Sequence, residues 1–323
     1  MRLLKVELTR FRSRRAIVLV LVAAALLTAL VAGTTIWETR PVSAADQARA
    51  EKQAAQDRDQ PWAKRELRQC LKDPQGWMGP NATAEDCEQM QPRAEWYLDR
   101  SPLDLKGVEE GQGTAIIVML TALLLVVGTT FAGADWGSGS VSNQLLFEPR
   151  RARVWLAKAG AVLVGSAAVA TVLLGTFWLT LYLVAESRGI STGATVQESI
   201  RWSAARGVAL AAGAATGAYA LTMLLRHTVG TLATLFAYAV GGEILMNTLP
   251  IEGIARWSLT NNVFAWIFDG YDYYDQSLPC SPNAEMCDQF AHLTLQGGAS
   301  LLGALLAGIA VVSVLLFRRR DIP

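Results

Sequence analysis

Charged residues are scarce in this chain, making up 18% of its 323 residues, whereas 52% are hydrophobic. Soluble globular proteins typically carry about a quarter charged residues. The formal net charge is only +1, so no basic excess favours a nucleic-acid partner. Scarce charge and abundant apolar residues together indicate a membrane protein.

The motifs of several enzyme classes are also missing. The chain has no G-x-x-x-x-G-K-[ST] sequence for binding ATP and no H-E-x-x-H zinc motif. One G-x-S-x-G string, at residues 189–193, falls in a short connection between apolar runs. A nucleophile elbow needs a strand before the string and a helix after it, so we interpret it as a chance match in a turn. We expect no catalytic residues, metal site or cofactor on this chain, and a membrane-embedded enzyme is the least favoured class.

In place of these motifs, the sequence has six long apolar runs. A helix of about 20 residues crosses a hydrocarbon core of roughly 30 Å, and only a helix satisfies its own backbone there. The predicted spans are residues 16–37, 114–134, 156–184, 205–225, 229–248 and 297–317. The first run is longer than the roughly 7–15 residues of a signal-peptide core, so we predict a retained anchor. The expected fold is an all-α integral membrane protein.

Basic residues predict the orientation of these spans. They lie before the first span, between spans two and three, between spans four and five, and after the last span. Because cytoplasmic loops are rich in Lys and Arg, we expect a multi-pass protein of the cell (plasma) membrane with both termini cytoplasmic. The cytoplasmic segments are then 1–15, 135–155 and 318–323. The longer extracellular segments are 38–113 and 249–296.

The four cysteines all fall in the segments expected outside, where disulfides persist. Three pairings are possible. We favour Cys70–Cys87 and Cys280–Cys287, because each pair closes a short local loop. Four unpaired thiols are the alternative. No histidine lies beside either pair, which argues against a metal site.

Residues 1–15 have Leu4, Leu8 and Phe11 at helical spacing, with basic residues among them. This pattern predicts an amphipathic helix lying at the cytoplasmic membrane interface. A frayed basic tail that only sets the topology is the alternative.

The extracellular segment 38–113 has the composition of a folded helical cap. Residues 43–72 are rich in good helix formers and are expected to extend the first span outward, until Pro61 interrupts or restarts the helix. A further helix is expected to begin at Thr83, which can cap it together with Asp86. In residues 249–296 the many aromatic side chains predict anchoring at the outer interface, with an exit gate as the alternative.

Two further features of the spans invite interpretation. Glu243 lies within the fifth span, and an ionisable group there suggests a functional site, with Arg206 as its expected partner. A carboxylate that merely reaches interfacial water is the alternative. Gly213 and Gly217 form a G-x-x-x-G pair, which permits a close approach of helices.

The largest cytoplasmic connection, residues 135–155, is expected to contain a short helix over 141–147 that Pro149 ends. A short helix projecting towards the cytosol suits docking to a soluble partner. A simple interfacial turn is the alternative.

Three stretches carry a family resemblance: MRLLKVELTRFRSRR at the start, GADWGSGSVSNQLLFEPRRARVWLAK over 133–158, and FRRRDIP at the end. With six spans between them, the chain resembles the membrane-spanning permease subunit of type-2 (export) ABC transporters. It is most similar to the actinobacterial branch, which has a long first extracellular segment. That family usually has Glu where this chain has Asp135.

The resemblance implies an export mechanism. A second permease subunit, either a copy of this chain or a close paralogue, would pair with it. A separate nucleotide-binding subunit would hold ATP and Mg²⁺ and drive export of an amphiphilic cargo such as a drug, peptide antibiotic or lipid. The N-terminal helix and the 135–155 loop would dock that subunit. The implied docking residues are Glu7, Asp135, Gly139, Asn143, Gln144, Phe147, Arg150 and Arg151.

A different class of function stays open. The chain could be a non-transporting membrane sensor or an assembly scaffold that uses its extracellular segment. A soluble ATPase encoded beside the chain would favour the transporter.

Overall fold

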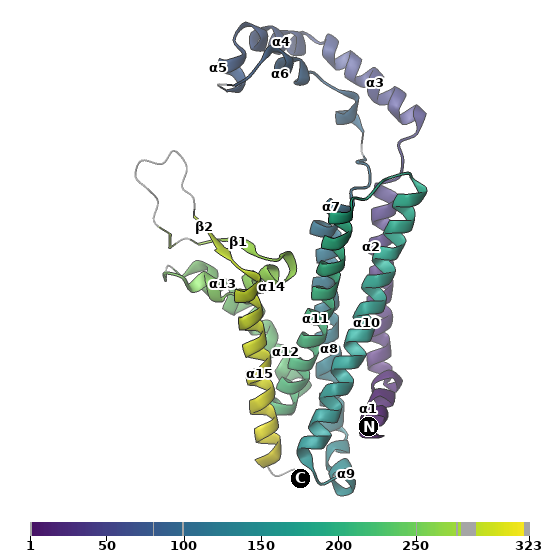
Figure 1. Cartoon of the computed structure of the whole chain (residues 1–323), viewed down its shortest axis with the longest axis vertical. Helices are drawn as coiled ribbons and strands as arrows, with labels where there is room; N and C mark the ends of the chain where they lie inside the picture. The colour runs from purple at the N-terminus through teal and green to yellow at the C-terminus, as the bar shows by residue number, and fades with distance from the viewer. Residues whose placement is uncertain are drawn as a thin grey trace. The chain divides into compact units, whose positions relative to one another are not determined.

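A computed structural model describes the chain apart from residues 1, 80, 99, 250, 276, 279–288 and 320–323, and the side chain of Asn247. The chain forms two compact units. The first unit comprises residues 1–32, 105–183 and 191–323, and the second comprises residues 33–104 and 184–190. Figure 1 shows both units.

Six helical stretches of the described chain are long and apolar enough to cross a membrane. They are α2 (Arg15–Glu38), Leu105–Gly137, α10 (Arg151–Ser187), α11 (Ala194–Leu225), Thr228–Met246 and α15 (Leu295–Arg319). The predicted six long apolar helices and the largely helical fold are therefore confirmed, and the composition fits a multi-pass membrane protein.

Two of the spans are built from several segments. The second consists of α7 (Leu105–Val108), the π-helix η2 (Glu109–Gly113) and α8 (Thr114–Gly137). The fifth consists of α12 (Thr228–Ala237), the π-helix η3 (Tyr238–Gly242) and α13 (Glu243–Thr248). π-Helical turns are rare and often mark functional sites.

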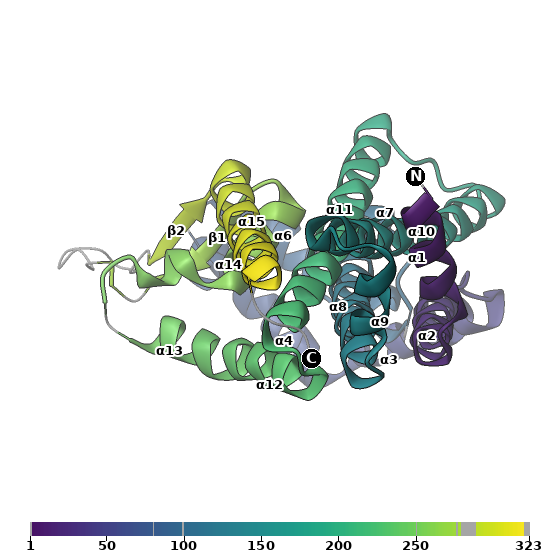
Figure 2. The same cartoon turned by 90° about the horizontal axis from the view of Figure 1, so that it is seen from below.

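The helices of the first unit are arranged around α8 and α11. These two lie between α2 and α10 on one side and α12 and α15 on the other (Figures 1 and 2). Side-chain hydrogen bonds reinforce the packing. The Trp155 indole donates to Ser313 at 3.1 Å, and the Ser313 hydroxyl donates to the Ala220 carbonyl at 2.7 Å. The Tyr219 hydroxyl donates to the Trp155 carbonyl at 3.1 Å. These bonds join α10, α11 and α15.

Two helical stretches extend beyond the spans that hydropathy predicts. The second span begins nine residues earlier than predicted, at Leu105 rather than 114, and α11 begins at Ala194 rather than 205. The additional turns carry polar side chains, which hydropathy alone assigns to loops. In the structure these side chains bond to one another, for example Ser199 to Glu109, so the helices continue.

The described chain is largely helical, with one short β-hairpin. Residues Tyr271–Tyr274 (β1) and Phe290–Leu293 (β2) form an antiparallel hairpin, with Tyr271 opposite Leu293. It follows η4 (Ile254–Trp257) and α14 (Leu259–Phe268). Phe264 packs on Tyr271 with ring centroids 5.2 Å apart, so some of the aromatic residues form a cluster within the protein.

The second unit is the predicted helical cap. It contains α3 (Ala44–Asp59), α4 (Pro61–Lys72), α5 (Pro74–Met78), α6 (Ala84–Gln89) and the 3₁₀ helix η1 (Ala94–Tyr97). The first span does not continue into it as one helix, because the helix ends at Glu38 and Ser43 caps a new one. Pro61 restarts the chain as the first residue of α4, where its missing N–H costs nothing.

The predicted cap of α6 is confirmed. Thr83 and Asp86 form a capping box, in which the Asp86 carboxylate accepts the Thr83 N–H and hydroxyl, each at 2.8 Å. These hydrogen bonds, the backbone one first, hold the pKa of Asp86 below its usual value.

The predicted Cys70–Cys87 disulfide joins α4 to α6, with both cysteines buried and their Cα atoms 5.7 Å apart. Cys280 and Cys287 lie outside the described residues.

Replacing Cys70 and Cys87 by alanine is expected to destabilise the cap by about 3 kcal/mol, as estimated for a cross-link that closes a loop of this length. Limited trypsin digestion should then cleave within residues 44–97 at lower protease concentration, while the spans stay intact. Replacing Cys280 and Cys287 instead provides the matched control. Equal cleavage in both variants would contradict a stabilising role for Cys70–Cys87.

Candidate functional site

A buried cluster of charged residues lies where four helices meet at one end of the first unit. The helices are α1 (Arg2–Ser13), the last turn of α8, α9 (Ser140–Phe147) and the first turns of α10. α1 is the predicted amphipathic helix, and its inner face buries Phe11 and Glu7. The side chain of Glu7 is fully buried, so its charge requires partners within the protein.

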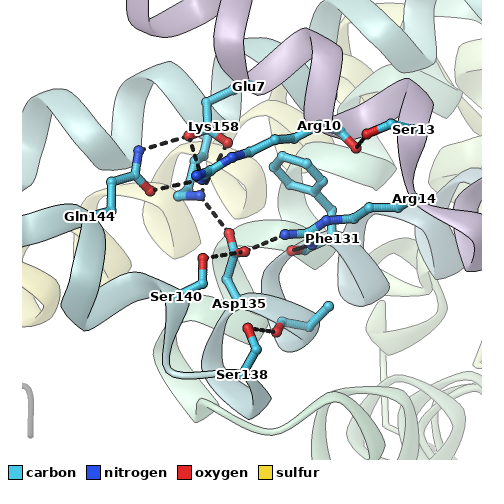
Figure 3. A network of polar contacts seen from close by, with 11 residues as sticks. Glu7, Arg10, Ser13, Arg14, Phe131, Asp135, Ser138, Ser140, Gln144 and Lys158 are labelled. Atoms are coloured by element: carbon cyan, nitrogen blue, oxygen red, sulfur yellow. Dashed lines mark hydrogen bonds and ion pairs between the residues drawn. The ribbon is translucent and has the colours of Figure 1, made fainter.

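Lys158 of α10 is the central cation of this cluster (Figure 3). Its ammonium lies 3.1 Å from a carboxylate oxygen of Glu7 and 2.5 Å from one of Asp135. The exposed fraction of the Lys158 side chain is 1%, and that of each carboxylate is 0%. A lysine is almost never buried to this degree unless it is paired.

Arg14, between α1 and α2, is the second cation on Asp135. Its guanidinium contacts one carboxylate oxygen and also donates to the Phe131 carbonyl at 2.6 Å. The Ser140 hydroxyl donates to the same oxygen of Asp135 at 3.1 Å. Asp135 thus joins the start of the first span to the end of α8 and the start of α9.

Glu7 connects α1 to α9. The Gln144 amide donates to Glu7 at 2.7 Å, and Arg10 contacts both Glu7 and Gln144 at 3.4 Å. Arg10 is 40% exposed, so it seals the cluster from outside. Two buried carboxylates with a buried lysine and two arginines leave no unbalanced negative charge.

The ring of Phe131 provides one wall of the cluster. The Arg14 guanidinium carbon lies 4.8 Å from its centroid and the Lys158 nitrogen 5.6 Å, distances typical of cation–π contacts. Phe11 packs against the same ring with centroids 5.8 Å apart. The cluster is therefore held by both charge and packing.

The tip of α9, beyond this cluster, is apolar and exposed. Leu146 is 80% exposed and Phe147 is 90% exposed. Gly139 begins the helix in the left-handed conformation, with φ of 66°, which glycine adopts without strain. The helix ends at Phe147, two residues before Pro149, as predicted. Because α9 is fixed at Gln144 and Ser140, its apolar tip has a defined position.

The structure separates the predicted docking residues into two groups. Glu7 and Asp135 are buried and bond to other residues of the chain, and Gln144 is engaged with Glu7. Gly139, Asn143, Phe147 and Arg150 are exposed, and Arg151 is half-buried. Only the exposed group is available to a partner.

Sequence reasoning missed Arg14 and Lys158 as members of the cluster, because both were counted with the charges that set the topology. A signal was present for Lys158. It follows Trp155-Leu156-Ala157 at the start of an apolar run, and a charge within a span is by default paired.

Glu243 and Arg206, the predicted intramembrane pair, bond to different partners. Glu243 accepts the Ser258 hydroxyl at 2.5 Å and the Leu259 N–H at 2.8 Å, so it caps α14. Arg206 lies within α11 rather than at its start and pairs with Asp269 at 3.0 Å. The helix cap explains why a carboxylate is present at position 243.

No protein-family model, curated protein or solved structure matches this chain.

Proposed function

We propose that this chain is the membrane-spanning permease subunit of an ATP-driven exporter, which docks a separate ATP-hydrolysing subunit through α9. The observation that carries the proposal is the exposed apolar tip of α9, Leu146 and Phe147, held by a buried ion cluster to α1, α8 and α10. A partner that pushes on this tip would act directly on α1 and on the two spans that contain α8 and α10.

Charge placement supports a cytoplasmic position for α9. The end of α15, with Arg318 and Arg319 in its last turn, lies at the same end of the first unit as α1 and α9 (Figure 1). The basic residues of α1 lie there as well. Positive residues concentrate on the cytoplasmic side of spans, where a soluble ATPase would be available. In this proposal the membrane is the plasma membrane, and a second permease subunit completes the pathway.

Replacing Phe147 by alanine is expected to weaken the complex with the ATPase by about thirtyfold or more, since a central aromatic anchor typically contributes at least 2 kcal/mol. The chain is co-expressed with a candidate soluble ATPase and purified through a tag on the chain. Co-purification and ATP turnover are then measured. Reversing the charge of Arg150 to Glu tests whether the exposed basic residue adds to the docking.

The matched control is Trp96→Ala in the cap, which removes another exposed aromatic side chain. It should leave co-purification unchanged. A complex that forms equally well with Phe147→Ala and Trp96→Ala would place docking elsewhere. Failure of the wild-type chain to bind any such ATPase would overturn the proposal.

The cap favours one other function, that of a sensor or assembly scaffold. It folds as a unit of its own with a buried disulfide. It also has a polar cavity of about 210 Å³, lined by Asp46, Arg49, Tyr97 and Arg100 among others. If the wild-type chain binds no ATPase, this cap is the part of the protein to test for ligand binding.

A further inference from the structure

Two cavities follow one another along α11 and α14 in the first unit. A polar cavity of about 560 Å³ is lined by residues of α11 from Thr195 to Arg206 and by the end of α14. An apolar cleft of about 450 Å³ is lined by α11 from Ala209 to Leu221, together with residues of α8, α12, α14 and α15. The Trp266 indole donates to the Arg206 carbonyl at 2.9 Å where the two meet.

The cations of the polar cavity already have carboxylate partners. Lys106 lies 3.0 Å from Glu109 and 3.4 Å from Glu110. Arg206 pairs with Asp269 at 3.0 Å. Neither cation is therefore left to attract an anionic ligand.

One carboxylate of the polar cavity remains available. Glu198 lines the cavity and is exposed, and no hydrogen bond or ion pair engages it within the part of the chain that the structure describes. Glu109, which is 4% exposed, accepts the Ser199 hydroxyl at 2.8 Å and lines the same cavity. The lining thus has a net negative charge.

Aromatic faces accompany this charge. Trp202, one helical turn after Glu198 on α11, is 60% exposed, and Phe268 is 38% exposed. Residues four apart share one face of a helix. A carboxylate beside exposed indole and phenyl rings is the combination that attracts an organic cation, through charge and cation–π contact.

The apolar cleft is long enough to hold the hydrophobic part of an amphiphilic ligand. No charged residue is among the described residues that line it. From Ala209 to Leu221, α11 rises about 18 Å. Gly213 and Gly217 form part of its wall, with the methyl groups of Leu306 nearby.

We propose that these two cavities form one site for an amphiphilic organic cation, with its charged head beside Glu198 and Trp202 and its apolar body in the cleft. As a cargo site this rests on the proposed function, but binding itself requires no ATPase. Anionic phospholipids fit the charge poorly, since the unpaired charge among the described residues of the cavity is negative.

The test compares two tritiated cations with the same head on the purified full-length chain in a nonionic detergent. Decyltriphenylphosphonium has an apolar chain, and methyltriphenylphosphonium lacks one. Glu198→Gln is expected to weaken binding of both by about fivefold, the effect of one partly exposed charge. Gly213→Leu fills the cleft and should weaken binding of the decyl compound about tenfold, because the decyl chain then loses apolar contact equivalent to one buried side chain. Binding of the methyl compound should be unchanged. Glu252→Gln, an exposed carboxylate outside both cavities, is the matched control.

Equal binding by the wild type, Glu198→Gln and Gly213→Leu overturns the site. So does tighter binding of decylsulfonate than of the decyl cation, which would show an anionic ligand such as a lipid headgroup. Site-dependent binding by a chain that recruits no ATPase would overturn the proposed function alone. If the chain recruits an ATPase but binds the cations equally well with and without Glu198→Gln and Gly213→Leu, this inference alone is overturned.

Discussion

Replacing Lys158 by methionine is expected to destabilise the first unit by about 3–5 kcal/mol, the usual cost of removing one partner of a buried ion pair. Methionine matches the length of the lysine stem, so packing is little changed. The carboxylates of Glu7 and Asp135, both fully buried, would lose the ammonium between them. The detergent-solubilised protein is heated to a series of temperatures and passed over a gel-filtration column. The temperature at which half of the folded protein peak is lost should be lower for the variant.

Neutralising the two carboxylates tests the cause of this loss. The triple variant Lys158→Met, Glu7→Gln, Asp135→Asn should regain part of the stability, because no unpaired carboxylate is then buried. Arg153→Met, an exposed cation on the same helix, is the matched control and should behave as wild type. If Lys158→Met were as stable as Arg153→Met, the cluster would not hold α1 to α10.

The cluster also links stability to the proposed docking. Gln144 of α9 donates to Glu7, and Ser140 donates to Asp135, so α9 is attached to the same two carboxylates that hold Lys158. An α9 without these attachments would still expose Leu146 and Phe147, but on a mobile loop. Pre-positioning a docking helix lowers the entropy lost on binding and transmits movement to the spans.

The sequence predicted what depends on hydropathy over about 20 residues, and so the six long apolar helices were found. Prediction from the sequence was less accurate where tertiary contacts determine the secondary structure. The polar turns at 105–113 and 194–204 are helical because their side chains meet, as Ser199 meets Glu109. Likewise β1 pairs with β2 only across an intervening segment, so neither four-residue strand gives a strong local signal.

Charge was the other source of error at the candidate site. Arg14 and Lys158 look in the sequence like the neighbouring topology charges, and only the fold distinguishes them by burying Lys158 between two carboxylates. Glu243 was recognised as unusual, but its role as a cap of α14 depends on residues 15 to 17 positions later in the chain. The short helix in the 135–155 loop was predicted correctly because Pro149 and the glycines before it act locally.

Replacing Gly128 by alanine is expected to destabilise the first unit by about 3 kcal/mol or more, at the upper end of the cost of overpacking. α8 and α11 approach each other closely here. A Cβ atom on Gly128 would lie 2.0 Å from the carbonyl oxygen of Ala215. Since the obstacle is backbone, no side-chain rotation can relieve the clash, and one of the two central helices must move.

The matched control is Gly175→Ala on α10, where an added Cβ meets nothing within 4 Å. Alanine there should be neutral or slightly stabilising, because it favours a helix over glycine by up to about 1 kcal/mol. The two variants make the same chemical change within helices of the same unit, so a lower midpoint for Gly128→Ala alone would show that the approach of α8 to α11 sets the cost. Equal midpoints would mean that α8 and α11 can move apart without loss of stability. The cavities along α11 would then be wider than in the structure.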